Sequence, residues 1–181
     1  VVTKCGTFFA PFLLRQFNFR RSCSMNFRQG GIVDKKELID KLNSLIRLDN
    51  DALSAYNKAI DAIKEPEINS EVIRFRSDHK RHVELLSDLI TKYGGVAAKG
   101  EQDVRGFFLG TAATIQSLTG LHGTLNAMLT GEQMTNKNYS QAIEWNVPED
   151  VQFVLKANYE DEKRHLRFFE KAVADKVWEK R

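Results

Sequence analysis

Apolar residues recur at steps of three and four along four stretches of the chain, and this spacing gathers them on one face of an α-helix. The first stretch opens with Asp34 and has Glu37 three residues later, an arrangement typical of a capped helix N-terminus. Pro66 marks its end. Every core-facing position is apolar or aromatic except Asp49; these positions are 38, 42, 45, 49, 52, 56, 60 and 63.

A second helix is expected to start near residue 69 or 70 and to stop at Gly94 and Gly95, since glycine readily takes the left-handed conformation found at helix C-termini. Its stripe carries two histidines, His79 and His82, which lie one above the other on the same face. The full stripe occupies positions 72, 75, 79, 82, 86, 89 and 93.

Residues 101–145 keep a helical period that several glycines interrupt, so we expect a short helix followed by a longer one. The longer helix carries Glu132 in a stripe at positions 121, 125, 128, 132, 135, 139 and 142. The last helix has Pro148 in its first turn and carries Glu162 and His165 in a stripe at positions 151, 155, 158, 162, 165, 169 and 172. This pattern predicts an all-α four-helix bundle with one long crossover that contains a short extra helix.

The two halves of the chain repeat each other. Positions 132, 139, 162 and 165 follow positions 49, 56, 79 and 82 at one constant spacing, and no gap is needed between the matched blocks. Residues 56–61 (YNKAID) match residues 139–144 (YSQAIE), and residues 78–82 (DHKRH) match residues 161–165 (DEKRH). The bundle is therefore predicted to consist of two copies of one helical hairpin.

Six titratable side chains fall on the core-facing stripes: Asp49, His79, His82, Glu132, Glu162 and His165. An unpaired buried charge costs on the order of several kcal/mol, so these groups must compensate one another. One or two divalent metal ions would satisfy the carboxylates and imidazoles together. A metal-free network of carboxylate–histidine hydrogen bonds is the alternative.

Two tyrosines and two further acids accompany this set. Tyr56 and Tyr139 stand two turns after the stripe carboxylates, where their hydroxyls can hydrogen-bond a ligand carboxylate across the bundle and fix its orientation. Ordinary core aromatics are the other reading of these tyrosines. Asp78 and Asp161 each precede a stripe histidine by four residues. They are expected to be additional ligands, hydrogen-bond partners of the ligands or solvated surface acids.

The motif Glu132-x6-Tyr139 followed by Glu162-x-x-His165 resembles the ferritin and rubrerythrin superfamily, and the likeness covers residues 34–178. Residues 94–95 (GG), 105–107 (RGF) and 131–139 resemble more narrowly a family of bacterial ferritin-like bundle proteins with no assigned function. The resemblance implies a ferritin-like four-helix bundle with iron in a di-metal carboxylate site. It also implies ferroxidase or peroxide-scavenging chemistry and a link to oxidative stress.

The first half of the chain departs from the superfamily pattern. Asp49 stands where glutamate is usual, and His79 replaces a carboxylate that bridges both metals in the superfamily. The predicted ligand set thus contains three carboxylates and three imidazoles, which shifts it from oxygen toward nitrogen. A mononuclear or zinc-like site is therefore a rival to a di-iron site, and zinc and manganese are alternatives to iron.

Charge is divided unevenly along the chain. The net charge is +3, but residues 1–33 hold five basic residues and no acid, so the remainder carries a net negative charge. A nucleic-acid role for the bundle thus loses its electrostatic support. The basic segment, expected to be disordered, is read as a targeting sequence, as a tail or as residues upstream of a start at Met25. It also holds both cysteines, which suits a cytoplasmic protein without disulfides.

The expected division is a basic extension over residues 1–33 and a ferritin-like bundle over residues 34–181, without a membrane span. Two functions are compatible with it. The first is a metal-binding protein, with enzyme activity undecided, that forms a homo-oligomer such as a dimer. The second is a stress-related bundle that acts by protein interaction or self-association, with a structural or vestigial site. Residues 104–123 would then provide a docking surface or a lid.

Overall fold

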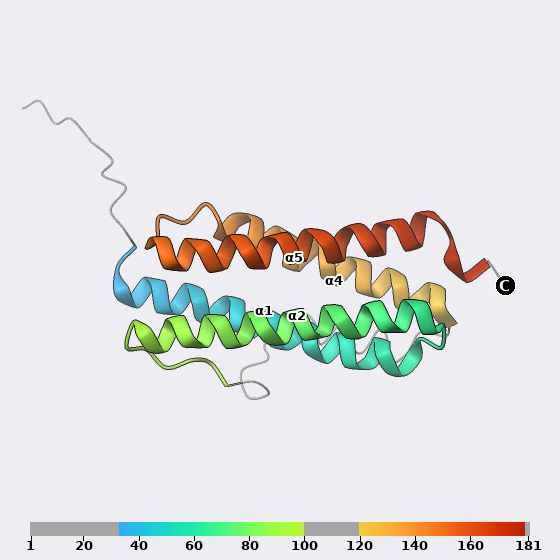
Figure 1. The fold of residues 1–181 in the computed structure, drawn as a ribbon, viewed down its shortest axis with the longest axis horizontal. Helices are drawn as coiled ribbons and strands as arrows, with labels where there is room; N and C mark the ends of the chain where they lie inside the picture. The colour runs from blue at the N-terminus through green and yellow to red at the C-terminus, as the bar shows by residue number, and fades with distance from the viewer. Residues whose placement is uncertain (1–32, 100–119, 180–181) are drawn as a thin grey trace, which may run out of the picture.

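The computed structural model describes residues 33–99 and 120–179, and within these ranges the protein is helical with no strand. Its elements are α1 (Lys35–Ala62), α2 (Pro66–Lys92), α4 (Gly120–Ala142), α5 (Glu149–Ala174) and a short 3₁₀ helix, η1 (Val177–Glu179). The four long helices form the bundle that the sequence predicted (Figure 1). The expected short extra helix and residues 1–32 lie outside the described residues. None of the described helices is long and apolar enough to cross a membrane.

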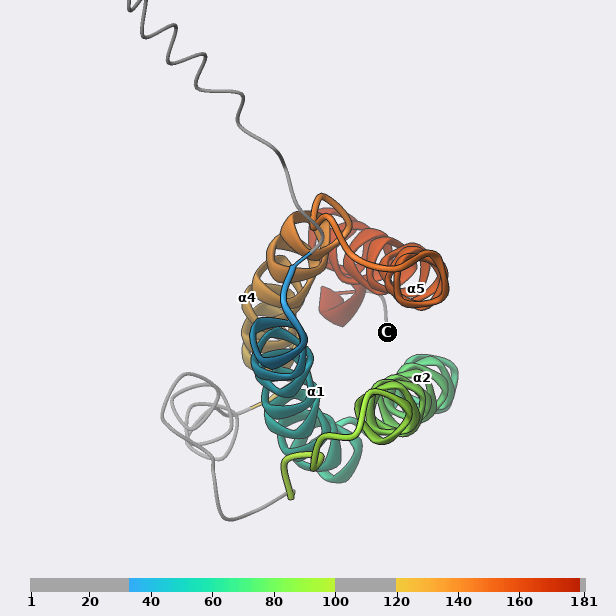
Figure 2. The same cartoon turned by 90° about the vertical axis from the view of Figure 1, so that its left-hand side faces the viewer.

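The helices occupy the four corners of the bundle, with α1 beside α2 and α4 beside α5 (Figure 2). The two hairpins join mainly through α1 and α4, and α2 faces α5 on the other side. Along the long axis α2 and α4 run in the same direction (Figure 1). This is the arrangement of a four-helix bundle with one long crossover.

Helix ends follow local chemistry. The Asp34 carboxylate accepts a hydrogen bond from the Glu37 backbone N–H at 2.8 Å, as the capping pattern predicted. At the end of α2, Gly94 has a positive φ of 68°, and the Gly95 N–H donates to the Ile90 carbonyl at 2.8 Å. These bonds terminate the helix in the left-handed geometry that glycine favours.

The predicted start of the second helix was wrong by about one turn. The helix begins at Pro66 itself, because the ring of a proline fits the first helical position and its missing N–H would have no partner there. Asn69 lies inside α2 and is not its cap. Its side-chain amide instead donates to the carbonyls of Ile60 and Ile63, at 2.7 and 2.8 Å, and satisfies the end of α1.

Two apolar clusters fill the interior, one toward each end of the bundle. One cluster includes Tyr56, Phe75 and Phe169, and the other includes Leu42, Leu86 and Leu155. On every helix the titratable stripe residues fall between the parts that contribute to these two clusters. The fold thus places one polar layer between two apolar ones, which keeps water from that layer.

Candidate metal centre

All six titratable residues that the stripes predicted are buried in this polar layer. Each is at most 1% exposed, and every one of the four helices contributes at least one of them: Asp49, His79, His82, Glu132, Glu162 and His165. Their atoms converge in two groups in which one nitrogen or oxygen per residue lies within 4.8 Å of the others. The structure therefore brings together the whole set that sequence reasoning selected.

The first group, which we call the Asp49 group, consists of Asp49, His79, His82 and Glu162. His79 Nδ1 lies 2.9 Å from Asp49 Oδ1 and 3.6 Å from Glu162 Oε1. His82 Nδ1 lies 3.6 Å from Asp49 Oδ1 and 3.3 Å from Glu162 Oε1. Two nitrogens and two oxygens thus face a common point.

The second group, the Glu132 group, consists of His79, Glu132, Glu162 and His165, so it shares two residues with the first. His165 Nδ1 lies 3.6 Å from Glu132 Oε2, and His79 Nε2 lies 3.8 Å from Glu132 Oε1. His79 therefore turns one ring nitrogen toward each group. His79, at the position where the superfamily resemblance implies a bridging carboxylate, thus lies between the two groups.

Several inward-facing atoms have no hydrogen-bond partner. In the described part of the chain these include atoms of both groups: His79 Nε2, His82 Nδ1, Glu132 Oε2, both carboxylate oxygens of Glu162, and His165 Nδ1. Buried polar atoms are normally hydrogen-bonded, and leaving one unsatisfied costs roughly 1–3 kcal/mol. Such a concentration of unpartnered nitrogen and oxygen atoms at one place fits divalent metal ions, which bind carboxylate oxygen and imidazole nitrogen together.

Both tyrosines reach across the bundle to a carboxylate of the opposite hairpin. Tyr56 Oη donates to Glu132 Oε1 at 2.7 Å, and Tyr139 Oη donates to Asp49 Oδ2 at 2.6 Å. Burial and the neighbouring carboxylates raise the pKa of each phenol well above its usual value, so both keep the proton they donate. Each bond occupies one oxygen and leaves the other oxygen facing the centre.

The two extra acids partner the ligand histidines. His82 Nε2 lies 3.3 Å from Asp161 Oδ2, and His165 Nε2 lies 3.1 Å from Asp78 Oδ2, so each acid serves the histidine of the other hairpin. A carboxylate on one ring nitrogen fixes the tautomer and directs the lone pair of the other nitrogen inward. Of the readings left open for Asp78 and Asp161, the structure shows the partner of a histidine.

Sequence reasoning missed two arginines that complete this layer. Arg81 bonds to Asp78 and Asp161, at 2.7 and 2.5 Å, and Arg164 bonds to the same two acids. The four side chains close the seam between α2 and α5 above the histidines. Both arginines occupy matching places in the internal repeat, and this coincidence was the signal that could have revealed them.

A family profile for a domain of unknown function matches residues 37–145, more than half of the chain. The chain belongs to the DUF2383 family. This agrees with the resemblance to bundle proteins of unassigned function that the sequence motifs indicated. No curated protein sequence matches this DUF2383 chain.

Two solved structures share the fold. A bacterioferritin-related protein from Bacteroides fragilis, described as a dodecameric thioferritin, matches with a TM-score of 0.69 at 16% identity, over 83% of this chain and 92% of that one. A two-domain protein from Anabaena variabilis with DJ-1/ThiJ/PfpI-like and ferritin-like domains matches with a TM-score of 0.64 at 14% identity, over 81% of this chain and 39% of that one. The DUF2383 chain is thus a ferritin-like four-helix bundle.

Charges in the metal-free centre compensate one another. Burial alone would raise the pKa of Glu132, but the nearby imidazoles of His165 and His79 outweigh it and bring that pKa to about 2. Burial likewise opposes a charge on His82, yet the nearby carboxylates of Asp161, Asp49 and Glu162 raise its pKa to about 10. The metal-free DUF2383 centre therefore holds protons on its imidazoles, and a metal ion would have to displace them.

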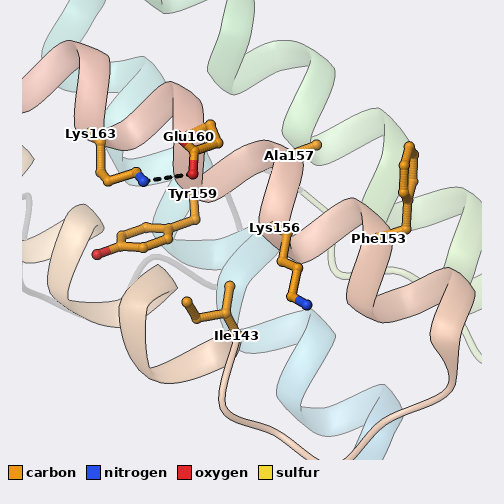
Figure 3. Close-up of a pocket in the computed structure, with 7 residues that line it drawn as sticks. All are labelled: Ile143, Phe153, Lys156, Ala157, Tyr159, Glu160 and Lys163. Carbon is orange, nitrogen blue, oxygen red and sulfur yellow. Dashed lines mark hydrogen bonds and ion pairs between the residues drawn. The ribbon is translucent and has the colours of Figure 1, made fainter.

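A separate hollow lies on the outer surface near the junction of α4 and α5 (Figure 3). Its volume is about 450 Å³, and it is lined by Ile143, Phe153, Lys156, Ala157, Tyr159, Glu160 and Lys163. Phe153 is 75% exposed, and Lys163 Nζ lies 4.9 Å from the centre of the Tyr159 ring. None of the six buried residues lines this hollow, so it is distinct from the candidate metal centre.

Proposed function

We propose that this protein is a ferritin-like metal-binding protein whose buried centre takes one or two divalent metal ions. The proposed ligands are Asp49, His79, His82, Glu132, Glu162 and His165, with Tyr56 and Tyr139 orienting the carboxylates. The observation that carries the proposal is the cluster of buried nitrogen and oxygen atoms without hydrogen-bond partners between the four helices. Those atoms have the ligand chemistry of Fe²⁺, Mn²⁺ or Zn²⁺.

Iron is the metal that the superfamily resemblance implies, and the chemistry it would supply is one-electron exchange with dioxygen or peroxide. The protein itself positions the proposed ligand side chains and shields them from water. The tyrosine hydroxyls hold Asp49 and Glu132 in place, and the aspartates orient the histidines. The two apolar clusters exclude bulk water from the polar layer. Ferroxidase or peroxide-scavenging activity is the catalytic form of the proposal.

Metal analysis tests this function directly. Full-length protein purified without chelator is expected to carry about one to two ions per chain, because the structure offers two overlapping ligand groups. Glu162→Ala removes the carboxylate that both groups share and should abolish binding, whereas Glu160→Ala, on the surface of the same helix, should not. Stoichiometry near zero after loading with iron and with zinc would refute the metal proposal. Anaerobic Fe²⁺ loading followed by dioxygen tests the catalytic form.

A second candidate is self-association, and the hollow beside Phe153 favours it. A large aromatic side chain that is 75% exposed beside Ile143 and Tyr159 is unusual on a free surface. The Bacteroides fragilis neighbour is dodecameric, and we propose that this chain also forms a homo-oligomer, a dimer at least, in the cytoplasm. Light scattering on the native protein and on Phe153→Ser should show dissociation of the variant. A monomeric native protein would refute the proposal.

A further inference from the structure

The two ligand groups are not equivalent, because an imidazole cannot replace a bridging carboxylate. A carboxylate has two oxygens and can give one to each of two ions. A neutral imidazole has one nitrogen with a lone pair and one that carries a proton. His79 turns Nδ1 toward the Asp49 group and Nε2 toward the Glu132 group, yet it can ligate in only one of them. One group therefore has four protein ligands, and the other has three.

The distances favour the Asp49 group as the complete one. A tetrahedral Zn²⁺ site with bonds of about 2.0–2.1 Å requires ligand atoms about 3.3–3.4 Å apart. Four separations within the Asp49 group are 2.9, 3.3, 3.6 and 3.6 Å, and they scatter around that value. The shortest is a hydrogen bond between His79 Nδ1 and Asp49 Oδ1, whose proton the ion would replace. In the Glu132 group the separation from His79 Nε2 to Glu132 Oε1 is 3.8 Å, and that oxygen already accepts a hydrogen bond from Tyr56.

Neighbouring side chains orient or leave unoccupied three of these four ligand atoms. Tyr139 occupies Asp49 Oδ2 and leaves Oδ1 to face the centre. Asp161 lies at His82 Nε2, which directs the lone pair of Nδ1 inward, and that nitrogen has no other partner. Glu162 has two unpartnered oxygens, so it can give Oε1 to this group. Two buried nitrogens and two buried oxygens are a donor set that suits tetrahedral Zn²⁺.

We propose that the first metal ion is a tetrahedral, zinc-type ion held by Asp49 Oδ1, His79 Nδ1, His82 Nδ1 and Glu162 Oε1, and that the Glu132 group binds a second ion only weakly. This inference rests on the proposed metal-binding function and specifies which half of the centre fills. It makes the half-site that departs from the superfamily pattern the stronger one.

The internal repeat supplies a matched pair of variants. Titration of metal-free, full-length protein with Zn²⁺ against a chromogenic chelator is expected to show one tight ion per chain. His82→Ala should weaken that ion by more than about 100-fold, because it removes a direct ligand, whereas His165→Ala should change it by less than about 10-fold. If His165→Ala abolishes the tight ion and His82→Ala spares it, the inference is overturned. If the native protein binds no metal ion at all, the proposed metal-binding function fails as well.

Two further measurements do not depend on the alanine variants folding. Co²⁺ bound to the native protein at one equivalent should give the intense visible absorption of tetrahedral coordination, and a weak six-coordinate spectrum would contradict the proposal. His79→Glu restores a side chain that can bridge, as its repeat partner Glu162 can. This variant should raise the stoichiometry from about one to about two ions per chain. An unchanged stoichiometry would show that His79 does not limit the second site.

Discussion

Two of the three histidines in the centre, His82 and His165, each contact one aspartate of the opposite hairpin. Asp161 lies 3.3 Å from His82 Nε2, and Asp78 lies 3.1 Å from His165 Nε2. Because the two pairs are related by the repeat, a change in one can be compared with the same change in the other. Their effects should differ only as far as the two metal groups differ.

Asp161→Asn is expected to weaken the first zinc ion by about 10–100-fold, because the amide fixes the His82 tautomer less well and lowers its basicity. Asp78→Asn acts on His165 and should leave that ion nearly unchanged. Both affinities can be measured by chelator competition at one pH. Equal losses in the two variants would mean that the two histidines contribute equally to the first ion.

The sequence predicted the residues of the centre but not its pairing. The stripes identified all six buried titratable residues because burial follows helical period, and the repeat indicated that they share one level of the bundle. No periodic signal tells which aspartate meets which histidine, since that depends on how α2 faces α5. Arg81 and Arg164 were missed for a different reason: both side chains are partly exposed, at 48% and 39%, so their positions on the helices are those of ordinary surface residues.

At the scale of single elements, helix ends were predicted where a residue has one conformational role. Asp34 and Gly94 are such residues, and both ends are confirmed. Pro66 is not, because proline both ends one helix and begins the next. The second helix was consequently expected to start near residue 69 or 70, whereas Asn69 lies inside α2 and bonds to the end of α1.

Gly94→Ala is expected to destabilise the protein by about 1–2 kcal/mol, because a Cβ is strained at a φ of 68°. Gly94→Asn should cost less, since asparagine tolerates the left-handed region. Urea unfolding of the two variants and the native protein gives the comparison. Identical losses would indicate that contacts of the new side chain, and not backbone strain, determine the cost.

For the whole molecule, the charged centre should make the stability of the metal-free protein fall at both acidic and alkaline pH. Burial alone would raise the pKa of Asp161, but hydrogen bonds with His82 and Arg164 outweigh it and lower that pKa from 3.8 to about 2. The stabilisation of the folded state by this carboxylate is therefore complete above pH 3.8 and is lost as the pH falls toward 2. The pKa of His82 rises from 6.5 to about 10, so the stabilisation of the folded state by this imidazolium is complete below pH 6.5 and is lost as the pH rises toward 10.

The metal-free protein should therefore be most stable between about pH 4 and 6.5 and should lose stability on either side. Urea midpoints across the pH range check this. Zn²⁺ should remove the loss on the alkaline side, because the ion takes the place of the imidazole protons and binds more tightly as pH rises. A flat profile for the metal-free protein would show that the buried charges do not change protonation on unfolding.

The seam formed by Asp78, Arg81, Asp161 and Arg164 bears on the timing of metal exchange. An ion that crosses between α2 and α5 must separate two arginines from the acids they bridge, and the same four side chains close again behind it. If the proposed ion exchanges by this route, the opening rate of the seam limits its exchange, and a slow opening would retain the ion even where a stronger competitor is in solution. The metal in the purified protein would then be the one that was available when the protein folded.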